Sequence, residues 1–289
     1  MKILIIGNGF IGTPIIHKLE SDGHELLIYS RTLKNGFESK QVVGEISNFL
    51  DFAKSHSWKP HVIIHTAWIT KHEIYTRHVS NYVYAQFTSA LAEYAVRAEL
   101  GHLIILGTCA EYGSQSTPSV AGITKLNPSN LYAEQKVIAF NSAKKSLLGS
   151  TTRLTWARIF HPYGPRQDKK RLIPYLIDSL KSEQEVRLTD TTSILDWITT
   201  RDIAAAISWV IKNDTPIEID VGTANGFTNV ELLKTLEGLL GSSQQWTKYS
   251  HETSLAKQVT LVGEDSPLLK SGWIPKDNLI TGLQWVLNS

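Results

Sequence analysis

The amino-acid sequence predicts an α/β fold, in which a doubly wound parallel sheet carries helices on both faces and a smaller, mixed α/β region follows at the C-terminal side. Short apolar strand patterns alternate with helical patterns up to Phe160. The first apolar run leads directly into a glycine-rich turn that opens a helix. After Phe160 an irregular segment and a more mixed pattern replace the alternation. These three observations predict the fold class.

The N-terminal unit has the strongest local pattern. Residues 3–6 form a continuous apolar run, which is typical of a strand buried on both faces of a parallel sheet. Ile15, Ile16 and Leu19 then recur at helical spacing, and residues 25–29 form a second apolar strand. The pattern therefore predicts a strand, a turn, a helix and a second strand in close succession.

The same alternation continues through the rest of the first half. Further strands are predicted at residues 42–43, 61–65, 102–106 and 153–160. Helices are predicted at residues 46–56, 75–98 and 131–148. The segment from His161 to Arg166 contains two prolines and a glycine and can extend neither a strand nor a helix, so the chain is expected to leave the sheet there.

The second half has a weaker pattern. Helices are predicted at residues 172–180 and 203–211, and residues 217–221 are expected to return to the sheet as a last strand. From residue 228 to residue 289, two or three short helices mix with weaker strands. No low-complexity linker separates the halves, so the second is expected to cap the carboxyl ends of the strands, where ligands bind in such folds.

Composition and charge exclude several classes of protein. The 289 residues carry a net charge of +2, and the longest like-charged run is Lys169-Lys170-Arg171, which argues against nucleic acid as the main partner. The single cysteine, Cys109, excludes an internal disulfide framework and a multi-cysteine metal site, and no metal site is predicted. No apolar stretch approaches the roughly 20 residues of a membrane span, and the N-terminal apolar run is too short for a signal peptide. We expect a cytoplasmic protein without a membrane partner.

The glycine-rich turn has the spacing Gly-x-Gly-x-x-Gly. Glycines let the chain turn tightly and let backbone N–H groups approach a pyrophosphate at the positive end of the helix. The alternative is a plain strand-to-helix turn without a ligand. The context favours a Rossmann-type dinucleotide-binding domain over residues 1–160 and a mainly substrate-binding region over residues 161–289. The candidate cofactor contacts in the turn are Gly7, Asn8, Gly9, Phe10, Ile11 and Gly12.

The end of the second strand decides which dinucleotide fits. An NAD-specific site places Asp or Glu there to accept hydrogen bonds from the adenosine ribose. This sequence instead has Ser30 and Arg31. An arginine can bind a 2′-phosphate with two charge-assisted hydrogen bonds, whereas a carboxylate would repel it. The pattern favours NADP(H) over NAD(H), and the alternative is that Arg31 is a solvated loop cation.

A tyrosine and a lysine, Tyr132 and Lys136, stand four residues apart on a predicted helix and therefore share one face. A nearby ammonium lowers the pKa of a phenol and suits it to proton transfer near neutral pH. Thr108 follows the preceding strand, so its hydroxyl is expected at the carboxyl edge of the sheet beside that helix. The three groups predict a relay around one substrate oxygen, for reducing a carbonyl or oxidising an alcohol. The alternative for Thr108 is a capping or turn role.

In these features the sequence resembles the extended short-chain dehydrogenase/reductase family of nucleotide-sugar epimerases, dehydratases and reductases. The resemblance covers nearly the whole chain. The segments that carry it, beside the glycine-rich turn, are Ile64-His65-Thr66-Ala67, Thr108 with Tyr112-Gly113, Tyr132 with Lys136, residues 158–165 and the segment from Asp196 to Asp202.

The resemblance implies a role for each matching position. Thr108 and Tyr132 would act on the reacting oxygen, while Lys136 would hold the nicotinamide ribose and tune Tyr132. The further cofactor contacts that it implies are Thr66, Ala67 and Phe160, and the implied substrate contacts are Asn81 and His161.

Departures from the family pattern narrow the reaction. Dehydratases of this family have Asp and Glu after the catalytic threonine, and here those positions are Cys109 and Ala110, which disfavours dehydration. Many members have an arginine before the Asp-aromatic pair that binds the substrate's pyrophosphate, and here that residue is Leu195. The cations that could replace it, unless they form a solvated basic loop, are Arg166, Lys169, Lys170 and Arg171.

The leading hypothesis is an NADP(H)-dependent reductase of a nucleotide-linked keto-sugar, of the 4-keto-6-deoxyhexose type, in which Tyr132 donates the proton. It depends on Ser30 and Arg31, because exchangeable NADPH suits a net reduction. A nucleotide-sugar epimerase with the same site is the first alternative. A non-enzymatic NADP(H)-binding regulator is the second.

The long helix predicted at residues 75–98 bears on the oligomeric state. Helices at this position commonly pair into a homodimer in the family that the sequence resembles, so a homodimer is expected. Packing within the subunit is the alternative. The apolar stripe of this helix consists of Tyr75, Tyr82, Val83, Leu91 and Tyr94.

Overall fold

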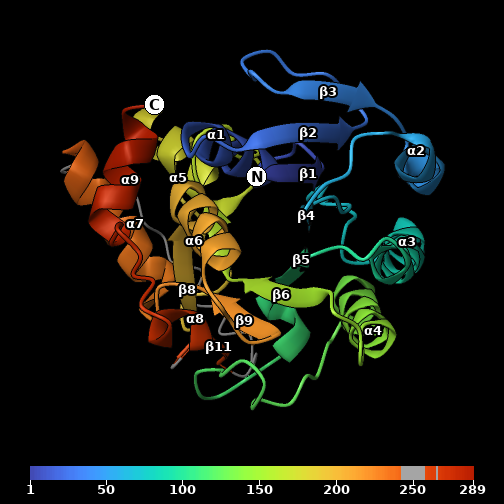
Figure 1. The fold of residues 1–289 in the computed structure, drawn as a ribbon. Coiled ribbons are helices and arrows are strands. Elements are labelled where there is room, and N and C mark those ends of the chain that lie inside the picture. The colour runs from blue at the N-terminus through green and yellow to red at the C-terminus, as the bar shows by residue number, and fades with distance from the viewer. Residues whose placement is uncertain (242–257, 265) are drawn as a thin grey trace.

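The computed structural model describes residues 1–241, 258–264 and 266–289, and over these residues its largest element is a seven-stranded parallel sheet (Figure 1). Its strands are β1 (Lys2–Ile6), β2 (Glu25–Ser30), β3 (Lys40–Val43), β4 (Val62–His65), β5 (His102–Thr108), β6 (Arg153–Ile159) and β9 (Glu218–Val221). They lie in the order β3-β2-β1-β4-β5-β6-β9. The chain builds outward from β1 to β3 and then returns to build the other half from β4, which is the doubly wound topology.

Helices cover both faces of this sheet (Figure 1). On one face lie α1 (Gly12–Ser21) and α6 (Thr200–Lys212), and on the other lie α2 (Phe49–Ser55), α3 (Ser80–Arg97) and α4 (Leu131–Ser146). Because successive side chains of a strand point to opposite faces, alternate residues of β1 enter two separate apolar cores. This explains the continuous apolar run in the sequence, and it confirms the predicted Rossmann-type fold class.

The helix predicted over residues 75–98 begins only at Ser80. The side-chain amide of Asn81 donates to the backbone oxygens of Tyr75 (2.7 Å) and His78 (2.8 Å), and so holds the preceding residues as turns. The helix predicted over residues 46–56 is likewise divided, into a 3-10 turn, η1 (Ile46–Asn48), and α2.

A second, smaller sheet is built around β8 (Ile194–Thr199). This strand pairs in parallel with β7 (His161–Tyr163) and β11 (Thr260–Leu261), and antiparallel with β10 (Gly226–Thr228). The chain does leave the large sheet after Phe160, but the expectation that residues 161–166 form no strand is wrong for the first three. Their backbone pairs with β8, which we did not predict from the sequence.

Most helices of this second region pack around an apolar core of their own, namely α5 (Leu172–Lys181), α7 (Asn229–Leu240) and α9 (Leu279–Leu287). The short helix α8 (Pro267–Lys270) instead adds Leu268 to the core on the α1 and α6 face of the large sheet. Residues 242–257 and 265, which belong to the stretch predicted to mix short helices with weak strands, lie outside the described residues.

Parallel strands bring their carboxyl ends to one edge of the large sheet. The glycine-rich turn follows β1 there, Thr66 follows β4, and Thr108 ends β5. His161 opens β7 just beyond the end of β6. The predicted site residues are therefore gathered at this edge, where the second region begins.

Candidate active site

The glycine-rich turn forms a close-fitting cradle at the start of α1. Gly7 has a φ of +103°, and a Cβ there would lie 2.7 Å from Thr66 Oγ1. A Cβ on Gly12 would lie 2.4 Å from the backbone oxygen of Gly7. A Cβ on Gly9, in contrast, would meet no atom within 4 Å, and α1 begins with neither a side-chain cap nor an acidic residue in its first turn. The positive end of the helix is thus open to an anion, and the turn fits a dinucleotide pyrophosphate.

Two cations stand beside this turn. Lys34 Nζ donates to the backbone oxygen of Asn8 (2.5 Å) and to Thr13 Oγ1 (3.2 Å). Arg166 lies in the loop after β7, and burial together with the charge of Arg166 lowers the pKa of Lys34. Because each charge disfavours the other, this arrangement favours an anion between or beside them.

The loop between β2 and β3 covers residues 31–39, and its acidic residue, Glu38, lies beside β3 and not at the end of β2. Ser30 is buried and its hydroxyl donates to the backbone oxygen of Thr32 (2.8 Å). Asn8 Nδ2 donates to the same oxygen (2.8 Å), so Ser30 and Asn8 tie the loop to the glycine-rich turn. The side chain of Arg31 is exposed at the start of this loop. Arg31 is therefore placed to meet an anion, whereas Ser30 shapes the loop.

Thr66 and Ala67 lie behind the glycine-rich turn. Thr66 Oγ1 donates to the backbone oxygens of Ile6 (3.0 Å) and Gly7 (3.1 Å), and the backbone N–H of Ala67 also donates to Ile6 (3.0 Å). These bonds fix the turn against β4. Of the remaining predicted contacts, Phe10 and Ile11 are partly exposed in the turn itself.

Thr108 and Tyr132 meet at the carboxyl end of β5. The helix α4 is capped by Asn130, whose side chain accepts from the N–H of Ala133 (3.0 Å), and this cap places Tyr132 in the first turn. The Tyr132 side chain is hydrogen-bonded to Thr108. The N–H of Tyr132 donates to the backbone oxygen of Thr76 (3.2 Å), which ties the loop before α3 to the same place.

Aromatic rings enclose the phenol of Tyr132. The Tyr75 ring lies edge-on at 5.1 Å between centroids, and the Trp68 ring lies edge-on at 6.4 Å. Burial raises the pKa of Tyr132 above its ordinary value, and the hydrogen bond to Thr108 offsets this rise only in part. The phenol therefore keeps its proton at neutral pH.

Lys136 points to the base of the site. Its Nζ donates to the backbone oxygen of Leu106 (2.5 Å) and lies 3.8 Å from the centroid of the Trp68 ring. Burial lowers the pKa of Lys136 to about 7, although Glu111 raises it in part. The predicted lowering of the Tyr132 pKa by Lys136 is wrong for this structure. The ammonium is turned toward Leu106 and Trp68, and burial decides the pKa of the phenol.

Asn81, Phe160 and His161 are engaged within the protein. Asn81 is fully buried and accepts from Trp68 Nε1 (2.8 Å), in addition to holding the loop before α3. Phe160 is also fully buried, against Tyr112. His161 packs on Trp197, and burial lowers its pKa to about 4, so it is neutral at pH 7. The side chains of Asn81 and Phe160 are thus packed within the protein.

Arg171, just before α5, faces the loop before α3. Its Nη2 donates to the backbone oxygen of Thr70 (3.1 Å), and its guanidinium lies over the Tyr75 ring at 4.9 Å. A cavity of about 290 Å³ lies beside this contact and is lined by residues that include Lys170, Tyr175, Arg187 and Asn229. Leu195, at the position of the family arginine, packs instead in the apolar core of the second region.

Sequence reasoning missed three residues of this site, namely Lys34, Trp68 and Glu111. Lys34 could have been found as the second cation after β2, three residues beyond Arg31. Glu111 could have been found from the Thr-x-x-Glu spacing after Thr108, which is typical of a capping box and forms one here. No pattern in the sequence indicates that Trp68 lies over Lys136.

The rest of the described chain holds a second cavity. It has a volume of about 550 Å³ and lies against the first residues of β2 and β3, at the sheet edge opposite to the glycine-rich turn. Within the described ranges, no three His, Cys, Asp or Glu side chains are grouped so that they could hold a metal ion. In that same part of the chain, no helix has the length and apolar character that crossing a membrane requires.

Known proteins match this chain over most of its length. Residues 3–222 match the model of the NAD dependent epimerase/dehydratase family. A UDP-glucose 4-epimerase of Lactobacillus helveticus is 22% identical over 278 residues, which cover 86% of this chain and 84% of the relative. A CDP-abequose synthase of Salmonella typhimurium is 28% identical over 137 residues, which cover 45% of this chain and 46% of the relative.

Solved structures show the same fold. A dTDP-glucose 4,6-dehydratase of Bacillus anthracis in complex with NAD is similar with a TM-score of 0.85 at 22% identity, over 100% of this chain and 96% of that one. A UDP-glucose 4-epimerase of Thermotoga maritima with UDP-glucose is similar with a TM-score of 0.79 at 19% identity, over 100% and 98% of the two chains.

Proposed function

Because the chain belongs to the NAD dependent epimerase/dehydratase family, we propose that it is an NADP(H)-dependent reductase of a nucleotide-linked keto-sugar, of the 4-keto-6-deoxyhexose type. Membership in this family confirms the predicted enzyme of the extended short-chain dehydrogenase/reductase type. The choice of NADP(H) and of reduction is supported by the charge around the glycine-rich turn and by the protonation of Tyr132.

The charge at the adenosine side of the site carries the proposal. Arg31 and Lys34 stand in the loop where an NAD-specific site has an acid, and Arg166 approaches from the second region. A 2′-phosphate would be attracted by these cations, and a guanidinium can bind it through two parallel hydrogen bonds. NADPH bound in this way can exchange after each turnover, which suits a net reduction.

The state of Tyr132 agrees with this direction of reaction. Burial raises the pKa of Tyr132, so the phenol holds the proton that a carbonyl oxygen must receive on reduction. Thr108, which is hydrogen-bonded to that phenol, would hold the same oxygen in place. Bound NADPH would supply the hydride. Oxidation of an alcohol, in contrast, needs the phenolate.

Dehydration is disfavoured by the two residues after Thr108. Burial and the charges of Asp196 and Asp220 raise the pKa of the Cys109 thiol, so it does not ionise near neutral pH. Ala110 has no titratable group. The acid and base that eliminate water in the dehydratase branch are therefore missing at these positions.

The cavity beside α5 fits the nucleotide part of the substrate. Its volume of about 290 Å³ lies at the lower end of the range for ligand pockets. Lys170 and Arg187 would meet the diphosphate in place of the arginine missing at Leu195, and Tyr175 offers a ring for the base. Arg171 stacks on Tyr75, whose ring contacts Tyr132. The sugar of a bound nucleotide would reach the catalytic pair along this path.

Consumption of NADPH tests the proposal. Purified protein is mixed with NADPH and, in turn, with CDP-, dTDP- and UDP-linked 4-keto-6-deoxyhexoses. We expect loss of NADPH absorbance with at least one of them, together with an equal amount of the 4-hydroxy product by mass spectrometry. If none of the three consumes NADPH, the reductase proposal is wrong.

An epimerase is the second candidate, because the curated relative that matches over 278 residues is a UDP-glucose 4-epimerase. Tyr132 and Lys136 would then act on a transient ketone, and the cofactor would stay bound through the turnover. Protein that is purified with oxidised cofactor, and that inverts C4 of UDP-glucose without added NADPH, would favour the epimerase.

The homodimer is also a proposal, through the outer face that α3 and α4 share (Figure 1). Val79, Tyr82 and Val83 on the first turns of α3 are 70%, 49% and 49% exposed, and Ile138 on α4 is 53% exposed. Of the predicted stripe, Leu91 and Tyr94 are buried within the subunit. Sedimentation should give a dimer for the wild type and a monomer for V83E/I138E, whereas a monomeric wild type would contradict the proposal.

A further inference from the structure

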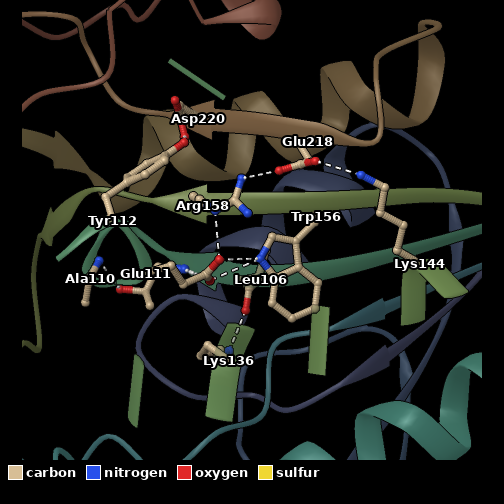
Figure 2. Close-up of polar contacts among 11 residues, drawn as sticks. Leu106, Ala110, Glu111, Tyr112, Lys136, Lys144, Trp156, Arg158, Glu218 and Asp220 are labelled. Carbon is tan, nitrogen blue, oxygen red and sulfur yellow. Dashed lines mark hydrogen bonds and ion pairs between the residues drawn. The ribbon is translucent and has the colours of Figure 1, made fainter. Parts of the chain in front are cut away.

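A buried carboxylate lies directly behind the catalytic turn (Figure 2). Glu111 belongs to the 3-10 turn η2 (Cys109–Tyr112) and is fully buried. Its Oε1 accepts from the backbone N–H of Thr108 (2.9 Å), and both of its oxygens accept from Trp156 Nε1 (3.0 Å each). Its Oε2 accepts from Arg158 Nε (2.7 Å). Residues from β5, β6 and η2 thus fix this carboxylate in one position.

The charge of Arg158 is shared with a second carboxylate. Arg158 Nη1 donates to Glu218 (2.9 Å) on β9, and Glu218 in turn accepts from Lys144 (3.1 Å) on α4. The Lys144 side chain is 50% exposed, so the chain of ion pairs runs from the active site to the surface. Figure 2 shows this sequence of contacts along one side of the site. Arg158 therefore pairs with two carboxylates, and Lys144 balances the outer one, Glu218.

A second cation, Lys136, contacts the same indole as Glu111. Trp156 Nε1 donates to Glu111, and Lys136 Nζ lies 6.0 Å from the centroid of the Trp156 ring. The charge of Glu111 raises the pKa of Lys136 in part. His65 on β4 also faces Lys136, but burial and Lys136 lower its pKa to about 3, so it is neutral. Tyr132, on the same helix as Lys136, is protonated at neutral pH. The Glu111 carboxylate packs directly against the backbone of Gly107 on β5, since a Cβ there would lie 2.6 Å from Glu111 Oε1.

We propose that Glu111 is a positioning residue of this active site, whose carboxylate fixes the turn that carries Thr108 and places a buried negative charge near the side-chain nitrogen of Lys136. The proposal rests on the proposed function, in which the ammonium of Lys136 would hold the nicotinamide ribose of NADPH, as the family resemblance implies. Opposite charges in a buried site attract strongly. A purely structural capping residue would need only a hydrogen-bond acceptor, which glutamine also provides.

The variant E111Q removes the negative charge of residue 111 and keeps the size of the side chain and a hydrogen-bond acceptor. The ammonium must be present for reaction, so activity falls as pH rises through the pKa of Lys136. Removing the negative charge lowers that pKa, and the fall in kcat/KM should move to a pH about one unit lower than in the wild type. The control is E218Q, which removes the outer partner of Arg158. E218Q should reduce thermal stability and leave the midpoint of the pH profile where it is.

The variant E111Q leaves the buried guanidinium of Arg158 without its partner Glu111, and this can prevent folding. A second variant keeps the test decisive in that case. The double variant E111Q/R158Q removes both charges of the fully buried pair, so no unpaired charge remains. The same downward shift of the midpoint is expected. An unshifted midpoint in a folded E111Q or E111Q/R158Q protein would overturn the proposal.

A readout without catalysis distinguishes this proposal from the proposed function. The pH titration of Lys136 is followed by NMR of protein that carries 13C at the lysine Cε atoms, which gives the titration midpoint of a buried amine in any folded protein. A lower midpoint in E111Q supports the role of Glu111 even if no keto-sugar is reduced. An unchanged midpoint beside normal NADPH-dependent reduction in the wild type overturns the role of Glu111 alone.

Discussion

The two ends of the candidate site carry charge in opposite ways. At the glycine-rich turn, Arg31 and Lys34 are exposed, and the acidic residue of their loop, Glu38, lies at its far end beside β3. Beneath Tyr132, Glu111 and Arg158 are fully buried and paired with each other. An exposed cation remains hydrated and available to an anion from outside, whereas a buried charge persists only with a partner. The first arrangement suits binding, and the second suits control of the catalytic pair.

The largest expected effect lies at the buried end. Replacing Tyr132 by phenylalanine removes the proton donor while leaving the ring contacts with Tyr75 and Trp68 in place. We expect kcat for the keto-sugar to fall by roughly 10²–10⁴-fold and the Kd for NADPH to stay within about twofold. Steady-state kinetics and fluorescence titration measure these two quantities.

The matched control for this variant is Tyr82→Phe, which removes a phenol hydroxyl from an exposed position on α3. Its kinetics should equal those of the wild type. Retained activity in the Tyr132→Phe variant would show that the proton comes from another group. The buried end of the site would then not be the source of the proton.

A smaller effect is expected at the exposed end. Arg31→Ala should weaken NADPH binding by about 10–100-fold, because a charge-assisted contact to the 2′-phosphate is lost, and should leave NADH binding unchanged. Lys34→Ala should act in the same direction. Arg97→Ala, an exposed arginine on α3, is the control. Equal losses for NADPH and NADH in Arg31→Ala would place Arg31 outside the 2′-phosphate site.

Salt sharpens the comparison further. Raising ionic strength from about 0.05 to 0.5 M should weaken NADPH binding several-fold, since salt screens the attraction between the exposed cations and the 2′-phosphate. The titration midpoint of Lys136 should hardly move, because Lys136 is 4% exposed and salt screens buried charges much less than exposed ones. A midpoint of Lys136 that follows ionic strength as strongly as NADPH binding does would remove the distinction between the two ends.

The smallest effect is expected away from both ends, where Asp22 joins α1 to α6. Burial alone would raise the pKa of Asp22. Hydrogen bonds from Lys18, Ser208 and Lys212 outweigh this effect and lower the pKa well below its ordinary value. This stabilisation is present above the unfolded-state pKa of about 3.9 and is lost as the pH falls below it. Asp22→Asn should therefore lower the free energy of unfolding by about 1 kcal/mol at pH 7, with a difference that shrinks below about pH 4. Denaturant unfolding at both pH values checks this, and a difference that grows in acid would contradict it.

The exposed end of the site could be predicted from the sequence because the backbone of the glycine-rich turn requires glycine at fixed positions. Gly7 adopts a positive φ, and Gly12 packs directly on the backbone of the turn, so these positions require glycine whatever surrounds them. The alternation of short apolar runs with helices then fixed the fold class, and the absence of an acid after β2 is read directly from the residues. Strand β8 was missed, since its polar and apolar residues give no clear period.

The buried end could be predicted only in part. Tyr132, Lys136 and Thr108 were found from spacing, but the pKa of Tyr132 was predicted in the wrong direction. The spacing of four residues places Lys136 and Tyr132 on one face, yet it says nothing about the carbonyl of Leu106 that receives the ammonium. The partners of Glu111 come from separate strands, and a contact such as Arg158 with Glu218 spans 60 residues of sequence.

The central claim is that the exposed cations at the glycine-rich turn select a cofactor with a 2′-phosphate. Calorimetric titration of the wild-type protein with NADPH and with NADH, in the same low-salt buffer, tests it most directly. We expect NADPH to bind at least about 10-fold more tightly, with the preference removed in Arg31→Ala. Equal affinities, or tighter binding of NADH, would contradict the claim.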